Sequence, residues 1–225
     1  MRTSLRVLTL NLFDGRARTD ALLDALETLA VDVLCVQELG PRLAGAIAEV
    51  LPGGRLAPDA SHRGLGIACR HETEVTSFPV PFRNGLAARL LPGTWSQVAA
   101  PTEIACVHIS GPHTWPYFPA KHTRRSQLRA LLAHLDREPD LPRAVLGDFN
   151  ASPLWPVYRR MARRLSDAAR ANPRPTWPHV PSRGLRGLIR IDHCFVQGLE
   201  VRGTQVVPVA GTDHLGLCVD LAART

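Results

Sequence analysis

Two stretches, LRVLTLNL at residues 5–12 and VDVLCVQE at residues 31–38, are short apolar runs that each end in polar side chains. Runs of this length and composition predict buried β-strands. Between them lies one apolar stripe at helical spacing, formed by Leu22, Leu23, Leu26 and Leu29. Thr19 or Asp20 can cap the helix that this stripe predicts. The chain therefore opens as strand, helix, strand.

The rest of the chain continues this alternation. A second helix is expected at 41–51, opening with Pro41 in its first turn. Residues 64–110 contain four strand-like runs (GLGIACR, EVTSFPV, GLAARLL, EIACVHIS) separated by Gly, Pro and Asn turns, which predicts antiparallel pairing. The later expected elements are helices at 121–135 and 153–169, a Pro-rich surface loop at 171–184, and strands at 144–150, 188–196, 199–207 and 215–221. Mixed strands with helices on two sides predict a layered α/β domain.

Length and composition narrow the class of protein. With 225 residues, one domain over residues 1–225 is the default, and 45% hydrophobic with 21% charged residues excludes long disordered or fibrous architectures. No apolar run reaches the roughly 18 residues of a membrane span, and the first residues run directly into a strand. We therefore expect a cytoplasmic monomer. The five cysteines show no CxxC spacing, which favours buried thiols over disulfides or zinc.

The charge balance is basic, with 27 Lys and Arg against 20 Asp and Glu, a net charge of +7. This excess suits a polyanionic partner such as nucleic acid or an anionic lipid surface. Only Lys121 is a lysine, so a bias in genomic base composition is an alternative explanation.

Polar residues at the ends of apolar strands are the candidates for chemistry. Each alone is typical of a residue that begins a turn. As a set they include Glu38, Asn11 and Asp213, an oxygen-rich group of the kind that Mg²⁺ prefers. Two Asp-His dipeptides at 192–193 and 213–214 each offer a histidine as general base, and spacing does not decide between them.

The ordered motifs LNLF, QE, VHIS, GDFN, RIDH and GTDH resemble the endonuclease/exonuclease/phosphatase superfamily, from residue 7 to 221. The resemblance is to small bacterial members. It implies a four-layered α/β sandwich like that of deoxyribonuclease I, with two packed mixed sheets flanked by helices. It also implies phosphate-ester hydrolysis that depends on Mg²⁺ or Mn²⁺, with the active site at the strand ends.

The resemblance assigns a cation and a base. Glu38 corresponds to the principal metal ligand, with Asn11 and Asp213 close to it. His214 corresponds to the general base that activates water, and Asp192 to the carboxylate that orients it.

It also assigns the groups around phosphorus. Asp148 and Asn150 flank the attacked atom, with Asn150 donating a hydrogen bond to a phosphoryl oxygen. His108 stands where relatives place a His or Tyr that stabilises the phosphorane or protonates the leaving oxygen. His193 is assigned to packing or local hydrogen bonding.

Several residues are candidates for substrate binding. Trp115, in the aromatic loop at 113–119, is suited to stacking on a base, inserting into lipid, or packing against the domain. Arg124 and Arg125 are expected to contact phosphates or to form a solvated helix face, and the resemblance puts Thr176 and Trp177 at the rim of the site. Four further arginines within 153–169 allow the same two interpretations as Arg124 and Arg125: Arg159, Arg160, Arg163 and Arg164.

The leading hypothesis is a metal-dependent phosphodiesterase that acts on nucleic acid, specifically a DNA nuclease. A phospholipid phosphodiesterase of the sphingomyelinase kind is the second enzyme hypothesis. The third, a catalytically silent nucleic-acid-binding module, requires the loss of a metal ligand or base, and every core position carries a competent residue.

Overall fold

Two six-stranded sheets pack face to face in the computed structural model, which describes residues 4–112 and 117–224. The first sheet has the order β13 (Leu199–Pro208), β14 (Leu215–Ala223), β1 (Leu5–Asn11), β2 (Val33–Gln37), β4 (Leu65–Cys69), β3 (Gly53–Ala57). The second has the order β5 (Glu74–Val80), β6 (Arg83–Leu90), β7 (Thr102–His108), β8 (Arg143–Asp148), β12 (Asp192–Gln197), β9 (Ser166–Asp167). Both sheets mix parallel and antiparallel pairs, as the sequence predicts.

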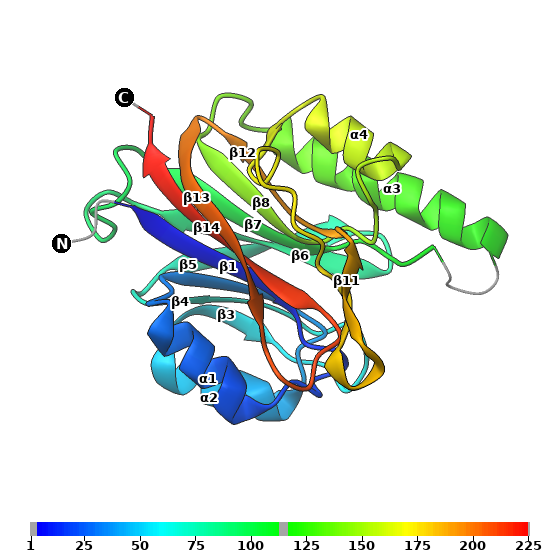
Figure 1. The fold of residues 1–225 in the computed structure, drawn as a ribbon. Coiled ribbons are helices and arrows are strands. Elements are labelled where there is room, and N and C mark those ends of the chain that lie inside the picture. Colours follow the sequence, from blue (N-terminus) through cyan, green and yellow to red (C-terminus); the bar gives the residue numbers. More distant parts are fainter. Residues whose placement is uncertain (1–3, 113–116, 225) are drawn as a thin grey trace.

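Helices cover the outer faces of the sheets (Figure 1). The first sheet carries α1 (Thr19–Thr28) and α2 (Pro41–Val50), and the second carries α3 (Tyr117–Leu135) and α4 (Pro156–Ala162). A separate hairpin of β10 (Trp177–Val180) and β11 (Leu185–Ile189) is joined by a 3₁₀ turn at Pro181–Arg183. The expected four-layered α/β arrangement is confirmed.

Each layer boundary is an apolar core. Side chains of β1, β2 and β4 pack against those of β6, β7 and β8 between the sheets. A second cluster lies between the first sheet and its helices, and a third between the second sheet and its helices. Burial of this surface stabilises the fold by about 25 cal/mol per Å². All five cysteines are free and buried, as expected. Within the described residues, we find no helix with the length and apolar character needed to cross a membrane.

Two expected elements are wrong in extent. The helix expected at 153–169 covers only Pro156–Ala162, because the chain turns after Arg163 and adds the short edge strand β9 to the second sheet. Leu154, expected in its core stripe, is 76% exposed. The expected surface loop at 171–184 contains β10 and leads through the 3₁₀ turn into β11, a hairpin outside both large sheets where proline does not interrupt a central ladder.

The first helix begins as expected but is not capped by the expected side chain. Its N-cap residue is Arg18, without a side-chain cap, and Thr19 lies inside the helix. The Thr19 hydroxyl instead accepts a hydrogen bond from the Arg42 guanidinium on α2. This contact joins the two helices of the layer.

Candidate active site

The first sheet brings its polar strand ends to one edge. The parallel register of β1 and β2 pairs Asn11 with Gln37, so that Glu38 follows directly at the end of β2. Strand β14 runs antiparallel to β1 and starts at Leu215, which places His214 at the same edge. Thr212 fixes this turn, because its hydroxyl donates to the Asn11 carbonyl at 2.7 Å.

The second sheet does the same on the opposite side. Parallel β7 and β8 pair His108 with Asp148, and antiparallel β12 begins at Asp192, directly opposite Asp148. Gly147 in the GDFN motif has φ +148°, and a Cβ there would lie 1.9 Å from the Val107 carbonyl oxygen. Glycine is therefore required for β8 to lie this close to β7.

Asn11 joins the two sheets at this edge. Its Nδ2 donates to Glu38 Oε1 and to Asp148 Oδ2, each at 3.1 Å, while its Oδ1 accepts from the Phe13 amide at 2.9 Å. Glu38 Oε2 also accepts from the Asp14 amide at 2.8 Å. The expected grouping of Asn11 with Glu38 is present, with the amide nitrogen of Asn11 facing the carboxylates.

A histidine–aspartate pair lies beside this bridge. His214 Nδ1 and Asp192 Oδ2 are 2.9 Å apart, and both side chains are buried. Thr176 is fully buried behind the pair, where its hydroxyl accepts from the backbone amides of Ile191 and Asp192. Thr176 thus supports Asp192 from inside the protein. The Nε2 atom of His214 lies on the other side of the ring, 4.0 Å from Asp213 Oδ1.

Carboxylates control the charge of this histidine. Burial disfavours the charged form of His214, but the charges of Asp192, Asp148 and Asp213 outweigh it and raise the pKa of His214 to about 10. Burial raises the pKa of Asp192, against the opposing charge of His214. For Asp148, burial is outweighed by hydrogen bonding from His108 and the charge of His214, so its pKa falls to about 2. Positive charge added beside these carboxylates favours the neutral imidazole that a general base requires.

His108 lies against the same carboxylates. Its Nε2 is 3.4 Å from Asp148 Oδ2 and 3.9 Å from Glu38 Oε1, and its ring is 4% exposed. On the other side of the ring, Nδ1 is 2.8 Å from Nη1 of Arg83. Arg83 is a site residue that the sequence did not indicate, because it stands at the start of a strand, after a Pro-Phe turn.

Asn150 occupies the expected place beside Asp148. Its backbone amide donates to Asp148 Oδ1 at 2.7 Å, and its side-chain Nδ2 donates to the Ile109 carbonyl and to Asp148 Oδ2, each at 3.0 Å. Nδ2 is also 3.5 Å from His108 Nε2. The amide is therefore held beside His108, with both of its hydrogens engaged.

The oxygen donors fit a hard divalent cation. Among the described residues, one group of three potential ligand atoms lies within 4.8 Å of one another, from Asp148, Asp192 and His214. Asp192 Oδ1 and Asp213 Oδ1 are buried without a hydrogen-bond partner, which is costly unless positive charge is nearby. Asp213 lies beside Trp177, whose indole donates to its Oδ2 at 3.0 Å. The carboxylates of this cluster, together with Glu38, are suited to Mg²⁺ or Mn²⁺.

Backbone strain is concentrated at this edge. Six non-glycine residues in the described part of the chain have positive φ, and five of them belong to the site or to its flanking turns: Phe13, Asp14, Glu38, Phe82 and Asn150. Such conformations cost of order 1–3 kcal/mol each and persist where the surrounding structure enforces them. The site is thus held in place by the packing around it.

The substrate-binding candidates are placed differently from one another. Arg124 is buried, and its guanidinium donates to the carbonyls of Ser110 and Asn150. Arg125 is exposed on α3, and Trp177 is half-buried beside Asp213. Trp115 lies outside the described residues. Arg124 therefore supports Asn150, while Arg125 and Trp177 remain accessible.

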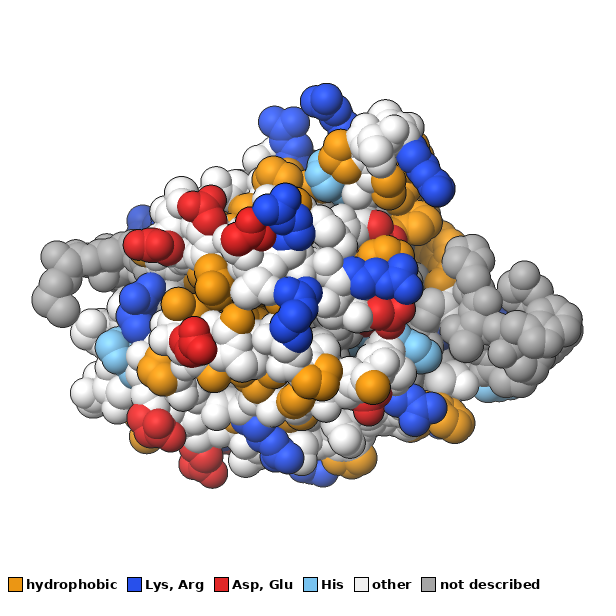
Figure 2. Space-filling view, turned by 90° about the horizontal axis from the view of Figure 1, so that it is seen from below, with side chains coloured by type: hydrophobic (Ala, Val, Ile, Leu, Met, Phe, Trp, Pro, Cys, Tyr) orange, Lys and Arg blue, Asp and Glu red, His pale blue; other side chains and the backbone are white. Residues whose placement is uncertain are grey.

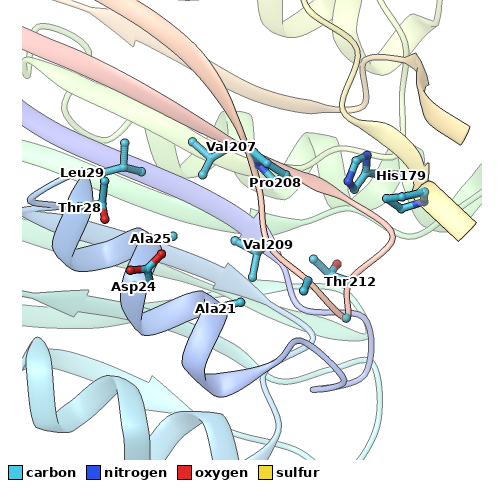
Figure 3. Close-up of a pocket in the computed structure, with 13 residues that line it drawn as sticks. Ala21, Asp24, Ala25, Thr28, Leu29, His179, Val207, Pro208, Val209 and Thr212 are labelled. Carbon is cyan, nitrogen blue, oxygen red and sulfur yellow. The ribbon is translucent and has the colours of Figure 1, made fainter.

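A pocket of about 520 Å³ lies behind the Thr212 turn (Figure 3). Apolar side chains of α1, of the end of β13 and of the residues that follow β13 form most of its wall, with Asp24, Thr28 and His179 among its polar members. Thr212 borders it, but the eight catalytic and metal candidates do not. The pocket is therefore separate from the catalytic cluster.

Comparisons with known proteins agree with this geometry. The model of the Endonuclease/Exonuclease/phosphatase family matches residues 8–214. A search of curated proteins gives no match.

Solved structures with the same fold cover nearly the whole chain. An endonuclease/exonuclease/phosphatase from Beutenbergia cavernae has a TM-score of 0.76 at 20% identity over 99% of this chain and 72% of its own. A humanized D. rerio TDP2 has 0.77 at 18% identity over 99% and 100%, and a mannosyl-6-phosphatase from Bacteroides thetaiotaomicron has 0.73 at 16% identity over 97% and 100%. At these identities the likeness shows the fold.

Proposed function

Since the chain belongs to the endonuclease/exonuclease/phosphatase family, whose members are hydrolytic phosphoesterases, we propose that its site hydrolyses phosphodiester bonds of DNA with Mg²⁺ or Mn²⁺. The observation that carries the proposal is the buried His214–Asp192 pair at 2.9 Å, in one cluster with Asp148. Asn11 joins this cluster to Glu38 by donating to both Asp148 and Glu38. A phosphate ester needs a positioned water, charge at its equatorial oxygens and a stabilised leaving group.

The chain's own residues cover the first requirement. Asp192 holds Nδ1 of His214, so that Nε2 takes the proton from water as the oxygen attacks phosphorus. The new P–O bond forms as the bond to the leaving oxygen breaks on the opposite side. When bound by Glu38 and its neighbouring carboxylates, a divalent cation supplies positive charge at the phosphate oxygens.

The substrate class rests on charge. A net charge of +7 favours a polyanion, and the arginines of α4 and Arg125 on α3 are exposed. On the face seen in Figure 2, basic and acidic side chains are mixed, so the basic excess is not gathered there. Arg125 and the arginines of α4 are therefore candidates to contact the DNA backbone.

The test is cleavage of plasmid and single-stranded DNA with Mg²⁺ or Mn²⁺, followed by addition of EDTA. We expect cleavage that EDTA abolishes and that falls with increasing salt. Sphingomyelin vesicles assayed for choline-phosphate release, and a panel of phosphomonoesters, serve as competing substrates. Turnover of one of these without cleavage of DNA would reject the substrate assignment and keep the metal-dependent chemistry.

A further inference from the structure

Arg83 lies against one ring nitrogen of His108. Its Nη1 lies 2.8 Å from His108 Nδ1 and donates to the His62 carbonyl at 2.6 Å. A guanidinium has donors and no acceptor, so the Nδ1 atom that it contacts accepts the hydrogen bond and carries no proton. The proton of His108 is therefore on Nε2, the atom nearest to Asp148 Oδ2 and Glu38 Oε1.

The carboxylates select the same tautomer. Nε2 lies 3.4 Å from Asp148 Oδ2, and a ring nitrogen beside ionised oxygen is a donor. Asp148 thus lies on the side of the ring that carries the proton, and the Arg83 contact is what excludes a proton from Nδ1.

The turn that presents Arg83 is itself constrained. Phe82 precedes it with φ +64° and is 76% exposed, an unusual conformation for a bulky side chain. The Pro81 carbonyl accepts from Gln127 Nε2 at 3.0 Å, which anchors the turn to α3. Arg83 is half-buried, and its charge interacts with Glu38 and Asp148. The fold therefore holds this cation at the site without forming a close ion pair.

We propose that Arg83 is a positioning residue that fixes His108 as an Nε2–H hydrogen-bond donor, so that His108 stabilises a phosphoryl oxygen and does not protonate the leaving group. A ring held in this way offers its proton at Nε2, and its Nδ1 is occupied as the acceptor of the Arg83 hydrogen bond. The part of the inference that concerns turnover rests on the proposed function. The part that concerns the tautomer does not.

The first test measures the tautomer. Two-bond ¹H–¹⁵N correlation spectra of the histidine rings at neutral pH should show His108 with its proton on Nε2 alone. In Arg83→Met the Nδ1–H form should appear, and Arg83→Lys should largely restore the original pattern. Arg63→Met is the matched control, because Arg63 is an exposed arginine whose charge acts on Arg83. A His108 proton on Nδ1 in the unsubstituted protein, or no change in Arg83→Met while its other signals stay folded, would overturn the inference.

The second test measures turnover of DNA and of bis(p-nitrophenyl) phosphate, whose leaving group needs no proton. If His108 only donates to a phosphoryl oxygen, His108→Ala lowers kcat by a similar factor for both substrates, roughly 100-fold, and the amide of His108→Gln recovers part of the loss. Loss confined to DNA, without recovery in His108→Gln, would assign proton transfer to His108 and refute the proposal. If DNA is not cleaved at all, the proposed substrate fails, while the tautomer measurement still decides the role of Arg83.

Discussion

The two Asp-His dipeptides are expected to behave oppositely, and His193 gives the sharper test. Its ring lies among Phe149, Tyr158 and Phe195, with centroid distances of 5.8, 4.9 and 5.5 Å. Nε2 contacts the Ala151 carbonyl at 2.7 Å, and Nδ1 is buried without a partner. Burial, helped by the charge of Arg190, lowers the pKa of His193 to about 4. His193 is therefore neutral in the folded protein.

This pKa sets a stability change with a definite sign. As pH falls below about 6.5, His193 binds a proton in the unfolded chain. In the folded protein the same histidine stays neutral until about pH 4. Stability is therefore complete above about pH 6.5 and declines as pH falls to about 4. About 2.5 pKa units at 1.36 kcal/mol each amount to roughly 3 kcal/mol. His193→Phe removes this dependence, at a cost of about 1 kcal/mol for the lost hydrogen bond.

Urea unfolding of both proteins between pH 7 and pH 4 measures the effect. Between pH 7 and pH 4, the unsubstituted protein should lose roughly 3 kcal/mol more of its free energy of unfolding than His193→Phe does. Phe149→Leu is the control, since it disturbs the same cluster without a titrating group and should give a constant difference. DNA cleavage by His193→Phe should stay within a few-fold of normal. Constant separation of the two unfolding curves would show that His193 is not buried in neutral form.

Four further substitutions test the site and its support. Glu38→Gln should lower kcat on DNA by about 100-fold or more with little change in Tm, because it removes charge and preserves shape; an unchanged rate would exclude Glu38 from cation binding. His214→Asn and Asp192→Asn should each lower kcat by about 10³–10⁴-fold, and the double variant by no more than the worse single one, because the pair acts as a unit; additive losses would argue for separate roles. Asp167→Asn should destabilise the fold by about 3–5 kcal/mol in urea, since it leaves the buried Arg190 guanidinium without its carboxylate; a loss below 1 kcal/mol would show that the pair contributes little.

The positions of the candidate site residues could be predicted because they lie directly next to apolar runs. Asn11, Asp148 and Asp192 each lie where a buried strand begins or ends. The parallel pairs β1–β2 and β7–β8 and the antiparallel pair β12–β8 bring such residues to one edge. A carboxylate next to a fully apolar strand is an unusual local pattern that a single sequence displays. The edge that holds the candidate site was therefore predictable before any coordinates.

Arg83 and the extent of two elements were not predictable in this way. The contact between Arg83 and His108 depends on the direction of one turn and on the register of the antiparallel strands β6 and β7. The helix after Pro156 is short because tertiary pairing of β9 with β12 competes with helical continuation, although the apolar spacing extends further. Thr176 resembles a residue of the rim in sequence, and only its burial shows that it supports Asp192.

Asn11 donates hydrogen bonds to carboxylates on different sheets, Glu38 on the first and Asp148 on the second. The proposed activity should therefore depend on the relative position of the two sheets. A slight loosening between the sheets should separate His214 from Asp192, and Glu38 from Asp148, before any strand is lost. Mild heat or denaturant should therefore abolish the proposed activity while the circular dichroism spectrum is still that of the folded protein. Cooling should restore the activity.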